Sequence, residues 1–373
     1  MAVVGVAEQR TGEAANRALA LCEKFGTNAN VLPALFAQFS YRMASANLAS
    51  GLPIAIQMVQ LGERTGDSVA RVVGHRAVGF CNLWMGNLQI AQDELETALC
   101  LGEMVDHQSL AFELGHDPVI TAQAFYGVLR LKRGNPEQGR ELIVAALERA
   151  QKAGHGLTTA YVLFQRMVFD LLAGDYPDLE RTGAAMQDIC ERQQIRQWYS
   201  LAAFVRGAAS SCLGGSIELS EVERLLGEHR RGSLQNHLPT YMMLLADVYA
   251  RQSNVADAGR WLSEAVATSE CINEHWLKPE FYLRQAQLAS AQGASEHECE
   301  RWLFASLEAA VKQQAKLSEL RAATALARRR AAQGRRGEAR DLLRPVYDWF
   351  TEGFGTKDLL EAKALLDELR APG

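Results

Sequence analysis

One spacing of small and branched residues recurs four times along the sequence and constrains the fold more than any other feature. In each copy a small residue is followed 12 positions later by a second one. Leu or Ile lies four positions beyond that second residue, and a small or apolar residue lies seven beyond it. The copies are Gly79, Ala91, Leu95 and Ala98; Gly127, Gly139, Ile143 and Ala146; Ala246, Ala258, Leu262 and Ala265; and Ala327, Ala339, Leu343 and Val346. Four independent matches indicate an internal repeat.

The residues around these positions have the helical period almost everywhere. Apolar residues recur at i, i+3, i+4 and i+7, and Ala, Leu, Gln, Glu and Arg dominate. Segments of roughly 13–20 residues are separated by breaks such as Gly86-Asn87 and Gly174-Asp175, and Gly or Asn after a helix is a common C-cap. The pattern predicts about fifteen or more helices joined as hairpins, and hairpins in series form a solenoid.

The repeated spacing has a direct physical meaning. Small residues on facing helices let the two axes approach closely, and Leu or Ile fills the groove beside them. The pattern resembles the tetratricopeptide repeat, whose period is about 34 residues. Here the corresponding small residues lie 40–48 positions apart, with a slipped copy at Cys299, so the helices or their connections are longer.

These observations define the expected architecture. We predict an all-α, tetratricopeptide-like solenoid, a right-handed superhelix of about seven or eight hairpins that forms a single domain over residues 1–373. The signature fades around 154–231, where we expect atypical repeats, and a capping helix is expected at about 356–369. An open solenoid should expose clearly more than the ~15,000 Å² of a compact globule of this mass.

Length and composition exclude several classes of protein. The 373 residues exceed the ~250–300 at which a single core stops growing, which suits a repeat that adds core as it lengthens. A net charge of −5 and a pI near 6.0 offer no basic field to nucleic acid. No apolar stretch approaches the ~18 residues of a membrane span, and the seven cysteines form no CxxC pair. We expect a cytoplasmic protein with no cofactor and no nucleic-acid or membrane partner.

Several short motifs carry a resemblance to a known family. They are Gly115-His-Asp-Pro118, Trp276 with Pro279-Glu280, Glu319-Leu-Arg-Ala-Ala323, Gln333-Gly334 with Glu338-Ala-Arg340, Val346-Tyr347 with Phe350-Thr-Glu-Gly-Phe354, and Asp358-Leu359. From about Gly12 to Leu369 the chain resembles the C-terminal helical-repeat region of bacterial signal-transducing ATPases, some of which carry a class III nucleotide cyclase domain. Gly355 departs from the pattern, where an aspartate is expected.

The resemblance implies a sensing or interaction role, with the ATPase and cyclase activities in other domains. The sequence has no G-x-x-x-x-G-K-[ST] loop to hold a triphosphate and no paired-aspartate metal site of the cyclase kind. We therefore expect a non-enzymatic chain, either one domain of a longer regulator or a stand-alone relative.

Two groups of polar residues invite a chemical function but have simpler interpretations. His116-Asp117 could suggest a metal site, yet Asp followed by Pro118 is a typical helix start, with Asp as the N-cap. The arginines from Arg328 to Arg344 lack the interleaved aromatics of a nucleic-acid site. They indicate a solvated surface or contact with an acidic partner.

The concave face offers the best candidates for binding. In the tetratricopeptide register, residues 18, 15 and 11 positions before the second small residue face the groove. The selected residues are Arg76, Phe80, Thr121, Val128, Thr240, Met243, Asp247, Arg321, Thr324 and Arg328, beside Val73 and Ala124. Guanidinium forks near both ends suit carboxylates or phosphates. No catalytic or metal-binding residues are predicted.

The sequence leaves three classes of function open. The leading hypothesis is a signal-transduction module that binds a protein or peptide partner, a small molecule, or neighbouring ATPase or cyclase domains. The alternatives are a passive scaffold or oligomerisation module, with a homodimer left open, and a toroidal α/α enzyme. The enzyme requires inward-facing acids, and among the groove positions only Asp247 qualifies.

Overall fold

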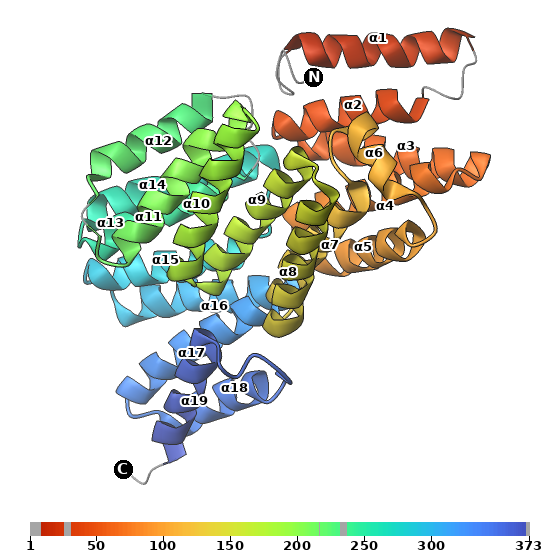
Figure 1. Cartoon of the computed structure of the whole chain (residues 1–373). Helices are drawn as coiled ribbons and strands as arrows, with labels where there is room; N and C mark the ends of the chain where they lie inside the picture. The colour runs from red at the N-terminus through yellow and green to blue at the C-terminus, as the bar shows by residue number, and fades with distance from the viewer. Residues whose placement is uncertain (1–8, 26–30, 216, 232–236, 371–373) are drawn as a thin grey trace.

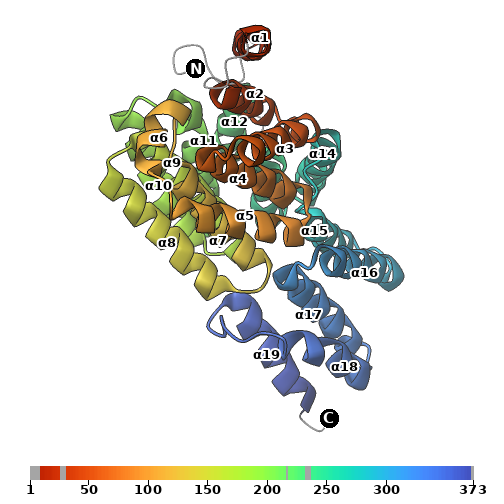
Figure 2. The ribbon, with the colours of Figure 1, turned by 90° about the vertical axis from the view of Figure 1, so that its right-hand side faces the viewer.

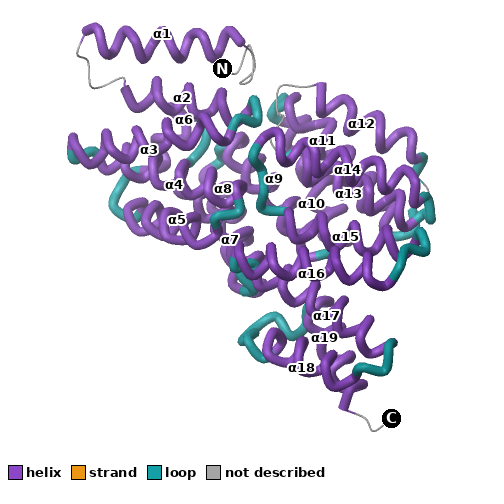
Figure 3. The backbone as a smooth tube through the Cα atoms, turned by 180° about the vertical axis from the view of Figure 1, so that it is seen from behind, coloured by secondary structure: helices purple, strands orange, loops and turns teal. Residues whose placement is uncertain are grey.

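The computed structural model describes residues 9–25, 31–215, 217–231 and 237–370, and within these ranges the chain is helical without strands (Figures 1 and 3). The helices are α1 (Gln9–Phe25), α2 (Val31–Ala44), α3 (Leu48–Thr65), α4 (Ser68–Met85), α5 (Leu88–Gly102), α6 (His107–Leu114), α7 (Pro118–Lys132), α8 (Pro136–Ala153), α9 (Gly156–Ala173), α10 (Tyr176–Arg192), α11 (Tyr199–Cys212), α12 (Leu219–Arg231), α13 (Leu238–Arg251), α14 (Val255–Ile272), α15 (Lys278–Ala291), α16 (Glu296–Gln313), α17 (Lys316–Ala332), α18 (Arg336–Tyr347) and α19 (Lys357–Arg370). A short 3₁₀ turn, Arg196–Trp198, precedes α11.

Most of these helices pair as hairpins of consecutive elements. The pairs are α2–α3, α4–α5, α7–α8, α9–α10, α11–α12, α13–α14, α15–α16 and α17–α18, and α19 packs on α17 and α18 at the C-terminal end (Figures 1 and 2). The short α6 is inserted between two hairpins and contacts α2 and α7. The predicted all-α solenoid of helical hairpins is confirmed. Each described helix is too short or too polar to span a lipid bilayer.

The small residues of the repeated spacing lie where the two helices of a hairpin meet. A Cβ atom on Gly79 would come within 2.7 Å of Leu95 Cγ. One on Gly127 would come within 2.5 Å of Ile143 Cγ1 and 2.8 Å of the Gly139 carbonyl oxygen. These separations are shorter than van der Waals contact, so the spacing repeats because the helices touch at these points.

Helix starts follow the expected chemistry at the entry to α7. Asp117 accepts hydrogen bonds from the backbone N–H groups of Val119 and Ile120, and Pro118 is the first helical residue. The carboxylate also lies 2.5 Å from His107 Nδ1. The interpretation of Asp117-Pro118 as a helix start is therefore correct.

The superhelix closes on itself, which corrects the expectation of an open solenoid. Residues far apart in the sequence meet across it. The backbone N–H of Trp276 donates to the Trp84 carbonyl oxygen at 3.2 Å, and Lys132 Nζ donates to the Trp276 carbonyl oxygen at 2.8 Å. In an open solenoid each repeat touches only its neighbours. The exposed surface is 16269 Å², only about a tenth above the ~15,000 Å² of a compact globule, because the inner faces of early and late helices cover one another.

Most arginines of the stretch from Arg328 to Arg344 lie at the surface, and several of them are paired with the protein's own acids. Arg329 lies 2.6 Å from Glu296 and Arg344 lies 2.6 Å from Asp348. Arg335 also contacts Glu338. This arrangement fits the solvated-surface interpretation.

Candidate binding cleft

A cleft of about 440 Å³ opens at the C-terminal side of the closed superhelix. We call it the arginine cleft. Its lining comes from the C-terminal end of α9 and from α10, α13, α15, α17 and α19: Leu171, Leu172, Ala173, Gly174, Tyr176, Asp247, Ala250, Arg251, Leu283, Arg284, Gln287, Arg321, Thr324, Ala325, Arg328, Lys357, Asp358 and Glu361. Five of these side chains are basic and three are acidic, so the cleft has a surplus of positive charge.

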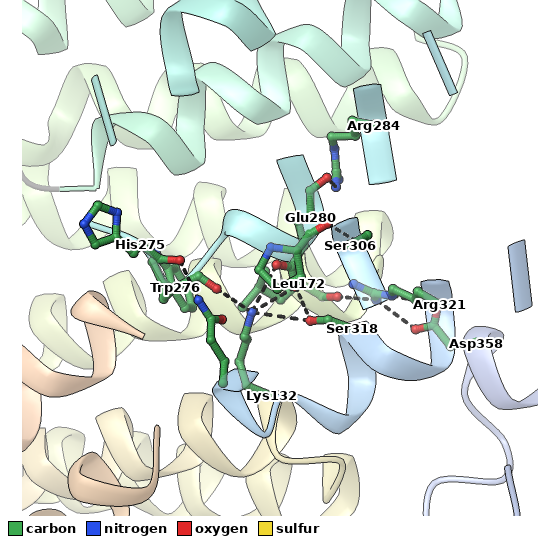
Figure 4. A network of polar contacts seen from close by, with 12 residues as sticks. Lys132, Leu172, His275, Trp276, Glu280, Arg284, Ser306, Ser318, Arg321 and Asp358 are labelled. Atoms are coloured by element: carbon green, nitrogen blue, oxygen red, sulfur yellow. Dashed lines mark hydrogen bonds and ion pairs between the residues drawn. The ribbon is translucent and has the colours of Figure 1, made fainter. Parts of the chain in front are cut away.

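Arg321 of α17 is held in one orientation at the base of the cleft. Its Nε and Nη2 atoms donate to the two carboxylate oxygens of Asp358 at 2.9 and 2.8 Å. Nη2 also donates to the Leu172 carbonyl oxygen at 2.6 Å, which ties α17 to the end of α9 (Figure 4). The Arg321 and Asp358 side chains are only 17% and 19% exposed. A bidentate pair of this kind fixes the guanidinium plane more firmly than a single contact does.

Arg284 of α15 is fixed in the same way by an acid of the neighbouring repeat. Its Nε and Nη2 atoms donate to the two oxygens of Asp247, both at 2.7 Å, and Nη1 donates to the Glu280 carbonyl oxygen at 3.4 Å. Burial alone would lower the pKa of Arg284, but Asp247 outweighs burial and raises it. Arg284 is therefore a permanent cation.

The outer part of the cleft carries more exposed cations. Arg251 lies with its guanidinium carbon 4.8 Å from the ring centre of Tyr176. Arg328 and Lys357 are well exposed and lie 3.6 and 3.9 Å from carboxylate oxygens of Glu361. Pairs this exposed and this long are weak. Their cations can exchange Glu361 for another anion at little cost.

A buried polar network lies directly behind the cleft and fixes its walls (Figure 4). Lys132 Nζ of α7 donates to both carboxylate oxygens of Glu280 at 2.9 and 3.1 Å, and Ser318 Oγ of α17 donates to Glu280 Oε1 at 2.6 Å. Lys132 and Glu280 are 0% and 2% exposed. Burial lowers the pKa of Lys132 despite its acidic partner. Burial would raise the pKa of Glu280, but Lys132 and Ser318 hold it below its usual range.

The structure divides the ten sequence-selected residues between two places. Asp247, Arg321, Thr324 and Arg328 line the arginine cleft. The other six face the interior of the superhelix, where contact between its opposite sides leaves each at most 6% exposed: Arg76, Phe80, Thr121, Val128, Thr240 and Met243. Val73 and Ala124 are also fully buried. The continuous open groove that the tetratricopeptide register suggests is therefore absent from the described part of the chain.

Two central residues of the cleft were missed by the sequence reasoning. Arg284 lies 15 positions before Cys299, so the same offset would have selected it from the slipped repeat. Asp358 belongs to α19, which lies outside the repeats. The rule that counts 18, 15 and 11 positions back from the second small residue of a repeat, which we call the offset rule, therefore does not select it.

Comparison with known proteins gives no family for this chain. No model of a protein family and no curated protein matches the sequence. Among solved structures, it is similar to yeast Tom70, with a TM-score of 0.35 and 12% identity, covering 97% of this chain and 96% of that one. It is also similar to a circular tandem repeat protein with novel repeat topology and enhanced subunit contact surfaces, with a TM-score of 0.22 and 16% identity, covering 96% and 89% of the two chains. Similarities of this size identify no function. The helices themselves place the chain among α-helical repeat proteins of the solenoid class.

Proposed function

We propose that the protein is a non-enzymatic interaction module whose arginine cleft holds an acidic segment of a partner protein. The observation that carries the proposal is the geometry of Arg284 and Arg321. Both are fixed by bidentate aspartates at the base of a cleft whose outer part adds Arg251, Arg328 and Lys357. The bidentate pairs hold the base of the cleft rigid, so a bound segment orders fewer side chains, and Arg251, Arg328 and Lys357 supply the cations that recognise carboxylates.

The volume of the cleft favours a short segment. About 440 Å³ falls in the range of small-ligand sites, so the cleft accommodates a few side chains of an extended peptide and no folded domain. Its charge surplus favours Asp and Glu in that segment and should steer its approach.

The sequence resemblance suggests where the acidic segment comes from. We propose that it belongs to a signal-transducing ATPase or cyclase domain, in the same chain or in another, whose output the repeats regulate. This finer proposal rests on the motifs between Gly115 and Leu359.

A pair of labelled peptides tests the cleft. We expect a fluorescent Asp/Glu-rich decapeptide to bind in a salt-sensitive manner, and its Asn/Gln counterpart not to bind. Charge reversal at the outer part, Arg251→Glu with Arg328→Glu, should weaken binding about 10-fold or more, because two attractions become repulsions.

The control reverses two arginines of α18 that lie outside the cleft, Arg340→Glu with Arg344→Glu. This variant changes the net charge by the same amount and should bind as the wild type does. Equal losses of peptide binding in both variants would show that binding responds only to the net charge of the protein and not to the cleft. Equal binding of the two peptides would favour a passive scaffold.

A further inference from the structure

Arg76, on the inner face of α4, is a buried arginine without an acidic partner. It is 3% exposed, its Nε donates to Thr121 Oγ1 at 3.2 Å, and its guanidinium carbon lies 5.1 Å from the ring centre of Phe125. Among the residues that the structure describes, its two Nη atoms have no hydrogen-bond acceptor and no carboxylate pairs with it. The donor edge of the guanidinium is thus unused.

The other inward arginines of the superhelix are paired differently. Arg284 and Arg321 each have a bidentate aspartate. Burial lowers the pKa of Arg76 to about 10, so the group keeps its charge at neutral pH. A buried charge without a counter-charge is strongly unfavourable. An anion that accepts hydrogen bonds from the Nη atoms of Arg76 would supply the missing counter-charge and remove this cost.

Two further polar groups with unused hydrogen-bonding capacity lie near Arg76. His116 is 5% exposed and its Nε2 has no partner among the described residues. Its ring centre lies 4.5 Å from that of Tyr161 of α9. Burial, followed by the charge of Arg76, holds the pKa of His116 well below its usual value, so the imidazole is neutral at pH 7. The Tyr161 hydroxyl forms no hydrogen bond with the described residues, and the side chain keeps part of its surface exposed.

Aromatic rings continue from these polar groups into the interior. Phe80 follows Arg76 by one helical turn and Phe164 follows Tyr161 by about one turn. Their ring centres lie 6.2 and 5.1 Å from that of His237, whose two ring nitrogens are buried without a hydrogen-bond partner in the described part of the chain; Nδ1 lies 3.9 Å from Glu274. These residues place a cation, two aromatic rings and a neutral polar group along one stretch of the interior, where Phe80 and Phe164 keep 6% and 5% of their surface exposed.

We propose that the interior of the superhelix binds a small organic carboxylate with a ring-containing apolar body, its carboxylate on Arg76 and its body along Phe80 and Phe164. Both oxygens of a carboxylate can accept from the two Nη atoms of one guanidinium. A phosphate ester carries about two negative charges at neutral pH and would meet only one cation here. The site shares no residue with the arginine cleft, so each proposal can fail without the other.

A panel of matched ligands tests this site in the full chain. Phenylacetate, indole-3-acetate and cyclohexanecarboxylate are each compared with their primary amides by thermal shift, and binding is then measured by titration calorimetry. We expect at least one carboxylate to raise the Tm by about 3 °C at 100 times its Kd, with no rise from its amide. A panel in which no carboxylate exceeds its amide would overturn the proposal.

Substitutions then assign the effect to Arg76. Arg76→Met should weaken carboxylate binding about 10- to 100-fold, the range for one hydrogen-bonded charge, and should raise the Tm of the ligand-free protein because an uncompensated charge is removed. Tyr161→Phe should leave the ligand-free Tm unchanged and weaken binding several-fold. The matched control, Arg284→Met, removes a paired arginine. It should lower the Tm and leave carboxylate binding intact. If the carboxylate ligand still raises the Tm of Arg76→Met, or if the ligand-free Tm of that variant is lower than that of the wild type, then Arg76 has a purely structural role.

Discussion

The ion pair between Lys132 and Glu280 provides the sharpest test of how the superhelix is held closed. The two residues are 148 positions apart, and Nζ lies 2.9 Å from Oε1. We consider Glu280→Gln, which keeps the shape of the side chain and removes its charge. Lys132 then remains buried among Trp276, Ser318 and an amide, with no counter-charge.

The expected cost follows from the distance and the burial of the pair. At an effective dielectric constant near 20, two charges 2.9 Å apart attract by roughly 6 kcal/mol. Lys132 limits the loss, because releasing its proton at pH 7 costs at most about 5 kcal/mol from an ordinary lysine pKa. Broken buried pairs lose about 3–5 kcal/mol, and we expect a loss of free energy of unfolding in that range.

The same reasoning predicts a dependence on pH. In Glu280→Gln the folded chain holds Lys132 neutral, whereas the unfolded chain keeps it protonated up to a pKa of about 10.4. Stability of this variant should therefore increase by up to about 1.4 kcal/mol for each unit of pH above 7, relative to the wild type. Urea unfolding followed by circular dichroism at several pH values measures both effects.

Two further variants complete the test. Lys132→Met combined with Glu280→Leu should recover most of the loss, since a buried pair is often replaced by apolar residues at little cost. The exposed pair Arg335–Glu338, with side chains 43% and 54% exposed, is the control. Glu338→Gln should change stability by less than about 1 kcal/mol. A loss below about 1 kcal/mol in Glu280→Gln, or a double variant no more stable than the single one, would refute the account.

Three other predictions concern packing, acid stability and the cleft. Gly127→Ala should destabilise the chain by about 1–3 kcal/mol because its Cβ would lie 2.5 Å from Ile143 Cγ1. Gly259→Ala, with open space around its Cβ, should stabilise the chain by about 0.5–1 kcal/mol. Urea unfolding measures both changes in the free energy of unfolding, which should have opposite signs. Burial lowers the pKa of His229 to about 4, so below pH ~6.5 only the unfolded chain takes up this proton, and stability should fall by up to about 3 kcal/mol between pH 6.5 and 4; His229→Leu should flatten that part of the pH profile, and an unchanged profile would contradict the assignment. Asp358→Asn should lower the Tm and weaken acidic-peptide binding because it frees the Arg321 guanidinium to move; unchanged values of both would show that the pair positions nothing.

The helices and their local contacts could be predicted because their signals lie close together in the sequence. Gly79 and Leu95 are 16 positions apart, and the requirement for a small residue at such a contact repeats in four of the hairpins. The helix start at Asp117 is more local still. Contacts of this range leave a period in the sequence, and the period identified the all-α solenoid.

The closure of the superhelix leaves no such period. Trp84 and Trp276 are joined by a backbone hydrogen bond across 192 positions, and nothing in the residues around either one indicates that the two meet. Whether a superhelix stays open depends on a small rotation between repeats, summed over many of them. The lengthened and slipped repeats change that rotation, and the offset rule carries no information about it.

Closure also explains why the offset rule led to an open cleft at one end and to a buried interior at the other. The rule selects residues on the inner face of each first helix, and Arg76 and Arg321 were both selected in this way. At Arg76 that face is covered by Thr121 and Phe125 of α7, so Arg76 is 3% exposed. Arg321 of α17 instead lies at the base of an open cleft, paired with Asp358 of α19. One inner face thus sets two arginines in different surroundings: Arg76 is enclosed, as the proposed small-molecule site requires, and Arg321 lies in an open cationic cleft, as the proposed peptide site requires.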